Sequence, residues 1–204
     1  KPHEYGPVIL PFTVLRRLDC VLAPTKAHVL AENATRQAQG LNPEPFLLRI
    51  TGVPFANTSP LDLRTLIGDQ DNIAAHLAAY IQGFTAPVRD IFERFRFAEQ
   101  TARLAKSGLL YKVTERFAAV PLHPDQVSNH DMGLAFEELI RRFAEMSNET
   151  AGEHFTPRDV IKLMVNLLFI EDSDILTPGR PVVRTIYDPT AGTGGMLSVA
   201  GEYL

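Results

Sequence analysis

The sequence predicts an α-helical N-terminal domain followed by the first elements of an open α/β sheet. Apolar residues recur at helical spacing up to about residue 180. The β-branched segment 182–187 (VVRTIY) then predicts a buried strand, the glycine-rich segment 188–195 a tight turn, and the apolar spacing from Met196 onward a helix. This order of elements, after a long helical region, is typical of the opening of an α/β sheet.

The helical region contains several separate segments. Helical patterns cover 8–23, 26–39, 61–67, 73–82, 88–97 and 109–120, a segment from Met132, and one from Pro157 through Leu168. Between them, 40–60 contains four prolines, which remove backbone donors, so we expect a long irregular connection there. Two prolines break the pattern again after residue 120, and we expect domains at 1–125 and 126–204.

Three local features lead to further expectations. Pro11 is tolerable only near the first turn of its helix. Glu137 and Arg141 lie four residues apart with opposite charge, which predicts an ion pair on the helix surface. Arginines beside the apolar stripe of 88–97 are either solvated charge or a basic contact face for nucleic acid.

Composition narrows the class of protein. The formal net charge is −4, so a DNA-binding role would need phosphate contacts from another region or subunit. Cys20 is the only cysteine, which excludes an intrachain disulfide and argues against a cysteine-rich zinc site; we expect no metal and read Cys20 as a small core residue. No apolar run approaches the roughly 20 residues that span a bilayer. The single cysteine fits a reducing compartment, so we expect a cytoplasmic protein. We also expect the chain to be a piece of a longer protein, because the sequence lacks an initial methionine and stops at Leu204 within a helical pattern.

The turn 188–195 (DPTAGTGG) carries the strongest chemical signal. Its glycines permit positive φ and close approach of a ligand to the backbone, and the helix start after it offers N–H groups to an anion. A dinucleotide fingerprint is incomplete because Leu197 takes its third glycine position, and a P-loop is excluded because no lysine follows residue 177. S-adenosylmethionine remains as the candidate ligand, and the carboxylate of Asp188 would then lie near its positive sulfonium. The alternative is a tight turn that binds no ligand.

Two motifs then resemble those of amino-methylating DNA enzymes. The turn DPTAGTGG matches the D-P-x-x-G-x-G form of their first methyltransferase motif, and 152–158 (GEHFTPR) matches their other cofactor motif, which precedes it. Together with 148–150 (NET) and the helical segments VILPFTVLRRLDCVL and FEEL, the chain resembles the methylation subunit of type I restriction-modification systems over essentially its whole length.

This resemblance implies that residues 126–204 begin a Rossmann-like S-adenosylmethionine-dependent methyltransferase domain, truncated at Leu204. It implies cofactor contacts from Glu153, His154, Phe155, Thr156, Pro157, Arg158, Asp188, Thr190, Ala191, Gly192, Thr193 and Gly194. Within this set we expect Thr156 to cap a helix that has Pro157 at its first position. Phe155 packs against the cofactor or simply in the core, and Arg158 reads more readily as solvated charge than as a ligand.

The resemblance also implies transfer of a methyl group to adenine N6 in a specific double-stranded DNA sequence, after the base is flipped out. The implied partners are a specificity subunit, a second methylation subunit and a restriction subunit, which residues 1–125 would contact together with or instead of DNA. The family's catalytic Asn-Pro-Pro-Phe/Tyr tetrapeptide is absent from the sequence, so we assign no catalytic residue and expect the chain alone to be inactive. Cytosine-C5 methylation would need a cysteine nucleophile, and Cys20 lies far upstream of both motifs. Two alternatives stay open: a non-catalytic module that docks other subunits, and methylation of another amine, in RNA or protein.

Overall fold

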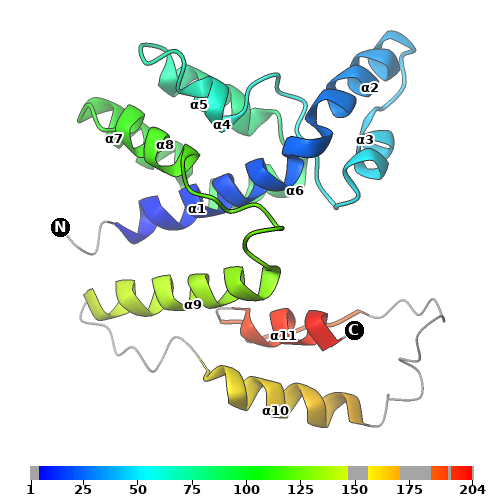
Figure 1. Cartoon of the computed structure of the whole chain (residues 1–204), viewed down its shortest axis with the longest axis vertical. Coiled ribbons are helices and arrows are strands. Elements are labelled where there is room, and N and C mark those ends of the chain that lie inside the picture. Colours follow the sequence, from blue (N-terminus) through cyan, green and yellow to red (C-terminus); the bar gives the residue numbers. More distant parts are fainter. Residues whose placement is uncertain (1–4, 147–155, 171–184, 193, 204) are drawn as a thin grey trace. The chain divides into compact units, whose positions relative to one another are not determined.

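The computed structural model describes residues 5–146, 156–170, 185–192 and 194–203 (Figure 1). It divides into two compact units. The helical unit is Pro7–Gln126, and the C-terminal unit is Val127–Leu204 together with Lys1–Gly6. No helix among the described ranges is long and apolar enough to cross a membrane.

The helical unit consists of α-helices of 4 to 17 residues and one 3₁₀ turn. They are α1 (Gly6–Leu22), a 3₁₀ turn η2 (Ala23–Thr25), α2 (Lys26–Ala38), α3 (Glu44–Thr51), α4 (Leu63–Leu66), α5 (Ile73–Gln82), α6 (Ala86–Arg94), α7 (Phe97–Lys106) and α8 (Leu110–Ala118). Within the described part of this unit the β-structure is a single bridge between Asn57 and Phe84.

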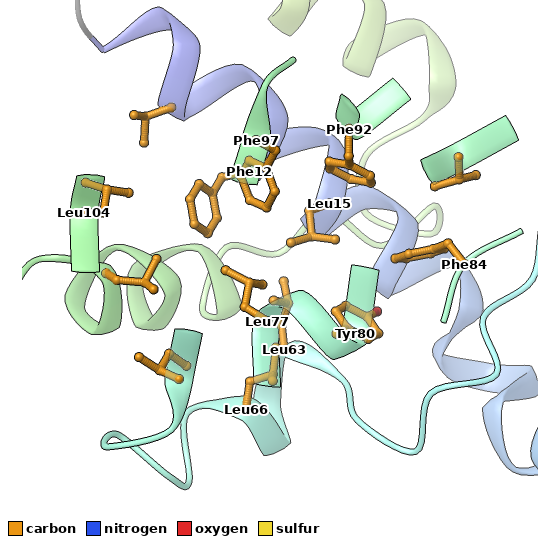
Figure 2. Packing of buried hydrophobic residues seen from close by; sticks show 14 of the residues in the cluster. Phe12, Leu15, Leu63, Leu66, Leu77, Tyr80, Phe84, Phe92, Phe97 and Leu104 are labelled. Atoms are coloured by element: carbon orange, nitrogen blue, oxygen red, sulfur yellow. The ribbon is translucent and has the colours of Figure 1, made fainter. Parts of the chain in front are cut away.

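The core of the helical unit forms around one face of α1. Phe12 and Leu15 are fully buried there. The Phe12 ring lies 5.0 Å from that of Phe97 on α7 and 5.1 Å from that of Phe117 on α8, and Figure 2 shows Phe12 beside Phe97. Aromatic pairs at this separation add to the stability gained from apolar burial. Cys20, on the same helix, is buried and unbridged, which confirms it as a small core residue.

One buried carboxylate ties three of these helices together. Asp19 Oδ1 accepts hydrogen bonds from the Tyr80 hydroxyl at 2.7 Å and from the Leu63 backbone N–H at 3.1 Å, and Oδ2 accepts from Arg16 Nη1 at 2.7 Å. Burial, reinforced by the Asp19 charge, raises the pKa of Tyr80 well above its ordinary value. A buried charge is tolerated here because several donors satisfy it.

Three expectations for this region were wrong. The connection 40–60 contains α3, because Pro43 and Pro45 stand at its N-cap and in its first turn, where a missing N–H costs no helical hydrogen bond. Pro11 lies inside α1, since this helix begins at Gly6. The pattern 88–97 is interrupted after Arg94, and α7 follows as a separate helix that the spacing did not predict.

The C-terminal unit contains α9 (Asn129–Met146), α10 (Arg158–Phe169) and α11 (Gly195–Tyr203), with α11 lying between the other two (Figure 1). Ile161 and Val165 of α10 are buried against Val199 and Ala200 of α11. The helix expected from Met196 is therefore confirmed. The start of the expected strand, 182–184, lies outside the described residues, and 185–187 form no strand, so the described chain does not establish a Rossmann-like sheet.

Candidate functional site

The glycine-rich turn takes the backbone conformation that its composition suggests. Gly192 and Gly194 have φ of +53° and +78°, in the left-handed region that glycine adopts at little cost. The turn is closed by a hydrogen bond from Gly194 N–H to the Ala191 carbonyl at 2.7 Å. At its start, Asp188 Oδ1 accepts from the Thr190 N–H at 2.9 Å, an Asx turn that orients the carboxylate.

A cavity of about 440 Å³ opens between this turn and α10. Five residues of the predicted cofactor set line it: Thr156, Asp188, Thr190, Ala191 and Gly192. Its size lies within the roughly 300–1,000 Å³ that is typical of small-ligand pockets. Two sequence segments about thirty residues apart thus contribute polar groups to one cavity.

The remaining predicted residues fall into two groups. Pro157, Arg158 and Gly194 are described but are not among the residues that line the cavity. Glu153, His154, Phe155 and Thr193 lie outside the described residues.

The start of α10 differs from the expected cap. The N-cap is Pro157, not Thr156, and no side chain caps the helix. Pro157 has ψ of 136°, an extended conformation outside the helix, and its carbonyl accepts the first helical bonds from Val160 and Ile161 at 3.0 and 3.1 Å. The helix begins one residue later than predicted, which leaves Thr156 exposed at the cavity wall.

Arg158 is not a solvated charge, as the sequence suggested. Its side chain is only 9% exposed, and Nη1 lies 3.2 Å from Glu137 Oε1 on α9. Glu137 is therefore paired with Arg158, a partner that helical spacing did not predict, and the structure gives an i,i+4 ion pair on α9 between Glu138 and Arg142. Arg141 and Arg142 contact Glu138 at 2.8 and 2.6 Å, and their hydrogen bonds lower the pKa of Glu138 to about 2. Helical spacing could not predict which arginine pairs with which glutamate. Glu137 and Glu138 are consecutive on α9, so their side chains point to different faces of the helix.

Sequence reasoning missed the apolar wall of the cavity. Ile161, Met164 and Leu168 of α10 line one side, and Met196 and Leu197 of α11 line another. Their helical periodicity was visible, but it indicates burial in general and not a ligand. Tyr187, directly before Asp188, also lines the cavity although the residue is 85% exposed. Among the described residues, no three His, Cys, Asp or Glu side chains cluster closely enough to hold a metal ion.

The chemistry of this cavity suits a small ligand with charged and apolar parts. Asp188 offers a negative charge, and the start of α11 offers backbone N–H groups to an anion. The side chains from α10 and α11 offer an apolar surface to a planar group.

Comparison with known proteins gives two family matches. Residues 1–117 match the model of the HsdM N-terminal domain, and residues 127–204 match that of N-6 DNA Methylase. No solved structure matches the chain significantly.

Curated relatives agree with these matches. The chain is 32% identical over 77 residues to the type I restriction enzyme EcoKI methylase subunit of Escherichia coli K12, which is 38% of this chain and 13% of that protein. It is 26% identical over 128 residues to the EcoEI methylase subunit of Escherichia coli, covering 61% of this chain and 24% of that protein. It is also 30% identical over 64 residues to the HindI methylase subunit of Haemophilus influenzae, covering 31% of this chain and 12% of that protein.

The match to the HsdM N-terminal domain covers more than half of the 204 residues. The resemblance to type I methylation subunits that the two motifs indicated is thereby confirmed. The chain belongs to the HsdM N-terminal domain family and continues into the first part of an N-6 DNA methylase region, as the N-terminal part of a type I methylation subunit does.

Proposed function

We propose that the protein to which this chain belongs transfers a methyl group from S-adenosylmethionine to adenine N6 in a specific DNA sequence. We propose further that the 440 Å³ cavity binds part of the cofactor. The observation that carries the proposal is the convergence of the two motif segments. Thr156 belongs to the motif 152–158, Asp188–Gly192 forms most of the motif 188–195, and both line the same cavity.

The residues of the cavity fit the charges of this cofactor. The carboxylate of Asp188 is suited to a cationic group, either the sulfonium or the ammonium of the methionine part. The N–H groups at the start of α11 are suited to its carboxylate. The apolar side chains of α10 and α11 are suited to its adenine ring and would exclude water from that side.

The motifs present in this sequence indicate which part of the reaction its residues would serve. When bound, the cofactor supplies the activated methyl group. In this proposal Thr156, Asp188 and the turn hold and orient it, and the group that positions the target amine comes from outside this sequence, which has no Asn-Pro-Pro-Phe/Tyr tetrapeptide. The motif residues 153–155 and Thr193 would complete the cofactor contacts.

We propose the partners on the same basis. The relatives are named as subunits of type I restriction enzymes, and they are longer than the matched region. With a net charge of −4, this chain would rely on a specificity subunit, a second methylation subunit and a restriction subunit for much of its grip on DNA.

Asp188→Ala in the full-length protein tests the cofactor site. We expect S-adenosylmethionine to bind about 10- to 100-fold more weakly in calorimetry, because a hydrogen bond to a charged group contributes about 1.5–3 kcal/mol. Asp71→Ala, which removes an exposed carboxylate in the helical unit, is the matched control and should leave the affinity unchanged.

Transfer of labelled methyl groups to duplex DNA, followed by nucleoside analysis, tests the reaction itself. Label in N6-methyladenine supports the proposal. Label in RNA or protein instead would overturn it in favour of methylation of another amine. If the unaltered protein binds no S-adenosylmethionine, the chain is better explained as a module that docks other subunits.

A further inference from the structure

A largely buried polar cluster joins α9 to α10 near the cavity, beside the start of α11. His130, Gly133 and Glu137 follow one another at helical spacing on one face of α9. Arg158, the first residue of α10, packs onto this face. Its Nη1 lies 3.2 Å from Glu137 Oε1 and its Nη2 lies 3.1 Å from His130 Nδ1.

Two glycines allow the three helices to pack closely here. Gly133 faces the Arg158 guanidinium, and the nearest side-chain atom to a Cβ added at Gly195 would be Ile161 Cδ1 of α10, at 2.6 Å. A Cβ on Gly133 would lie 3.3 Å from Arg158 Nη1 and 3.4 Å from Ser198 Oγ of α11. A Cβ on Gly195, the first residue of α11, would lie 3.6 Å from Glu137 Oε1. The Glu137 carboxylate therefore lies where the first residues of α10 and α11 meet α9.

The position of this cluster links it to both polar walls of the cavity. Thr156 lines the cavity two residues before Arg158, and Gly192 lines it three residues before Gly195. Arg158 is hydrogen-bonded to Glu137, and the start of α11 lies beside the same glutamate, so this pair lies between the two motif segments. Neither Glu137 nor Arg158 lines the cavity.

We propose that the Glu137–Arg158 ion pair is a positioning device, which holds the two motif segments at the spacing that the cofactor requires. This inference rests on the proposed function of the cavity. The pair is suited to the role because both side chains are largely buried: that of Glu137 is 16% exposed and that of Arg158 is 9% exposed. The planar guanidinium can contact two acceptors on α9 at once, which a lysine ammonium cannot do with the same geometry.

The test compares four changes in the full-length protein: Glu137→Gln, Arg158→Lys, Arg158→Ala and the double change Glu137→Gln with Arg158→Ala. Calorimetry measures S-adenosylmethionine affinity, well below the unfolding temperature of the least stable variant. We expect roughly tenfold or greater weakening for Glu137→Gln and Arg158→Ala, and a smaller loss for Arg158→Lys. The double variant should have about the same cofactor affinity as whichever of its two single variants binds more weakly. The reason is that substitutions of two residues in one ion pair do not have additive effects.

Glu138→Gln is the matched control. It removes a neighbouring glutamate charge that pairs with Arg141 and Arg142, which lie on α9 itself. We expect its cofactor affinity to equal that of the unaltered protein. In methyl transfer, the pair variants should raise KM for the cofactor more than they lower kcat, a split that a general loss of folded protein would not produce.

The outcomes separate this inference from the proposed function. If the unaltered protein does not bind the cofactor, the proposed function fails. If it binds and the pair variants bind equally tightly, only the positioning role is overturned. Additive losses in the double variant would also overturn it. If an alanine variant does not fold, Glu137→Gln and Arg158→Lys nearly preserve side-chain volume and decide the question alone.

Discussion

Gly192→Val in the full-length protein tests whether the backbone conformation of the turn matters for ligand binding. Gly192 has φ of +53°, and a Cβ there would meet only the Thr190 carbonyl oxygen, at 3.8 Å, an ordinary contact. The substitution therefore causes no steric clash. Its cost is the left-handed backbone itself, about 1–2 kcal/mol for a residue with a side chain and more for a β-branched one.

The strained turn has two ways to respond, and both are measurable. If it keeps its conformation, the protein loses about that much stability. If it relaxes, the N–H groups and Asp188 leave their positions at the cavity. Since about 1.4 kcal/mol corresponds to a tenfold change in affinity, we expect S-adenosylmethionine to bind roughly 5- to 30-fold more weakly.

Gly40→Val provides a matched control for this experiment. Gly40 follows α2 in the helical unit with φ of +70°, and no atom would lie within 4 Å of its Cβ. It carries the same backbone penalty in a part of the protein without the cavity. Thermal unfolding should detect a similar loss in both variants, whereas calorimetry should detect weaker binding only for Gly192→Val. Equal cofactor affinity in the two variants, together with a smaller loss of stability for Gly192→Val, would refute the role assigned to the turn, because the turn would then have relaxed without weakening binding.

Two further substitutions test other parts of the structure. Thr156→Ala should leave thermal stability nearly unchanged, because Thr156 does not cap α10, yet weaken cofactor binding measured by calorimetry; the reverse result would restore it as a cap. Tyr80→Phe removes the hydrogen bond to Asp19 and should cost about 1–3 kcal/mol at pH 7. Because the pKa of Tyr80 is raised by folding, its contribution is complete below the unfolded pKa of about 10 and is lost as pH rises toward the folded value. The stability difference between the two proteins in denaturant titrations should therefore shrink above about pH 10, and a constant difference would contradict the assigned burial of the phenol.

The sequence alone predicted features that depend on short-range interactions. The bounds of α5 follow from its periodicity, and the positive φ angles of Gly192 and Gly194 agree with what the glycines permit. The two motifs identified the family, because each combines particular residue types at fixed spacing. Burial of Cys20 followed from its place on an apolar helix face. Each of these depends on residues within a few positions of one another.

Tertiary structure determined the helix boundaries where local sequence preferences conflicted or gave no prediction. The break between α6 and α7 occurs at Arg96, whose φ of +52° is unfavourable for a residue with a side chain. Phe92 and Phe97, on either side of this break, are both buried. The stability gained from burying them depends on tertiary contacts, which local sequence preferences do not include. At the start of α10, one residue of shift moved the cap from Thr156 to Pro157.

The candidate site shows the same division between local and long-range information. The sequence named Thr156 and Asp188 but gave no indication that α10 and α11 would form an apolar wall between them. It suggested a surface partner for Glu137, whereas the fold pairs this residue with Arg158, 21 positions away. Helical periodicity shows that a face is buried without showing which helix covers it. Only the packing of α9, α10 and α11 decided which charges are paired in the interior and which residues surround the cavity.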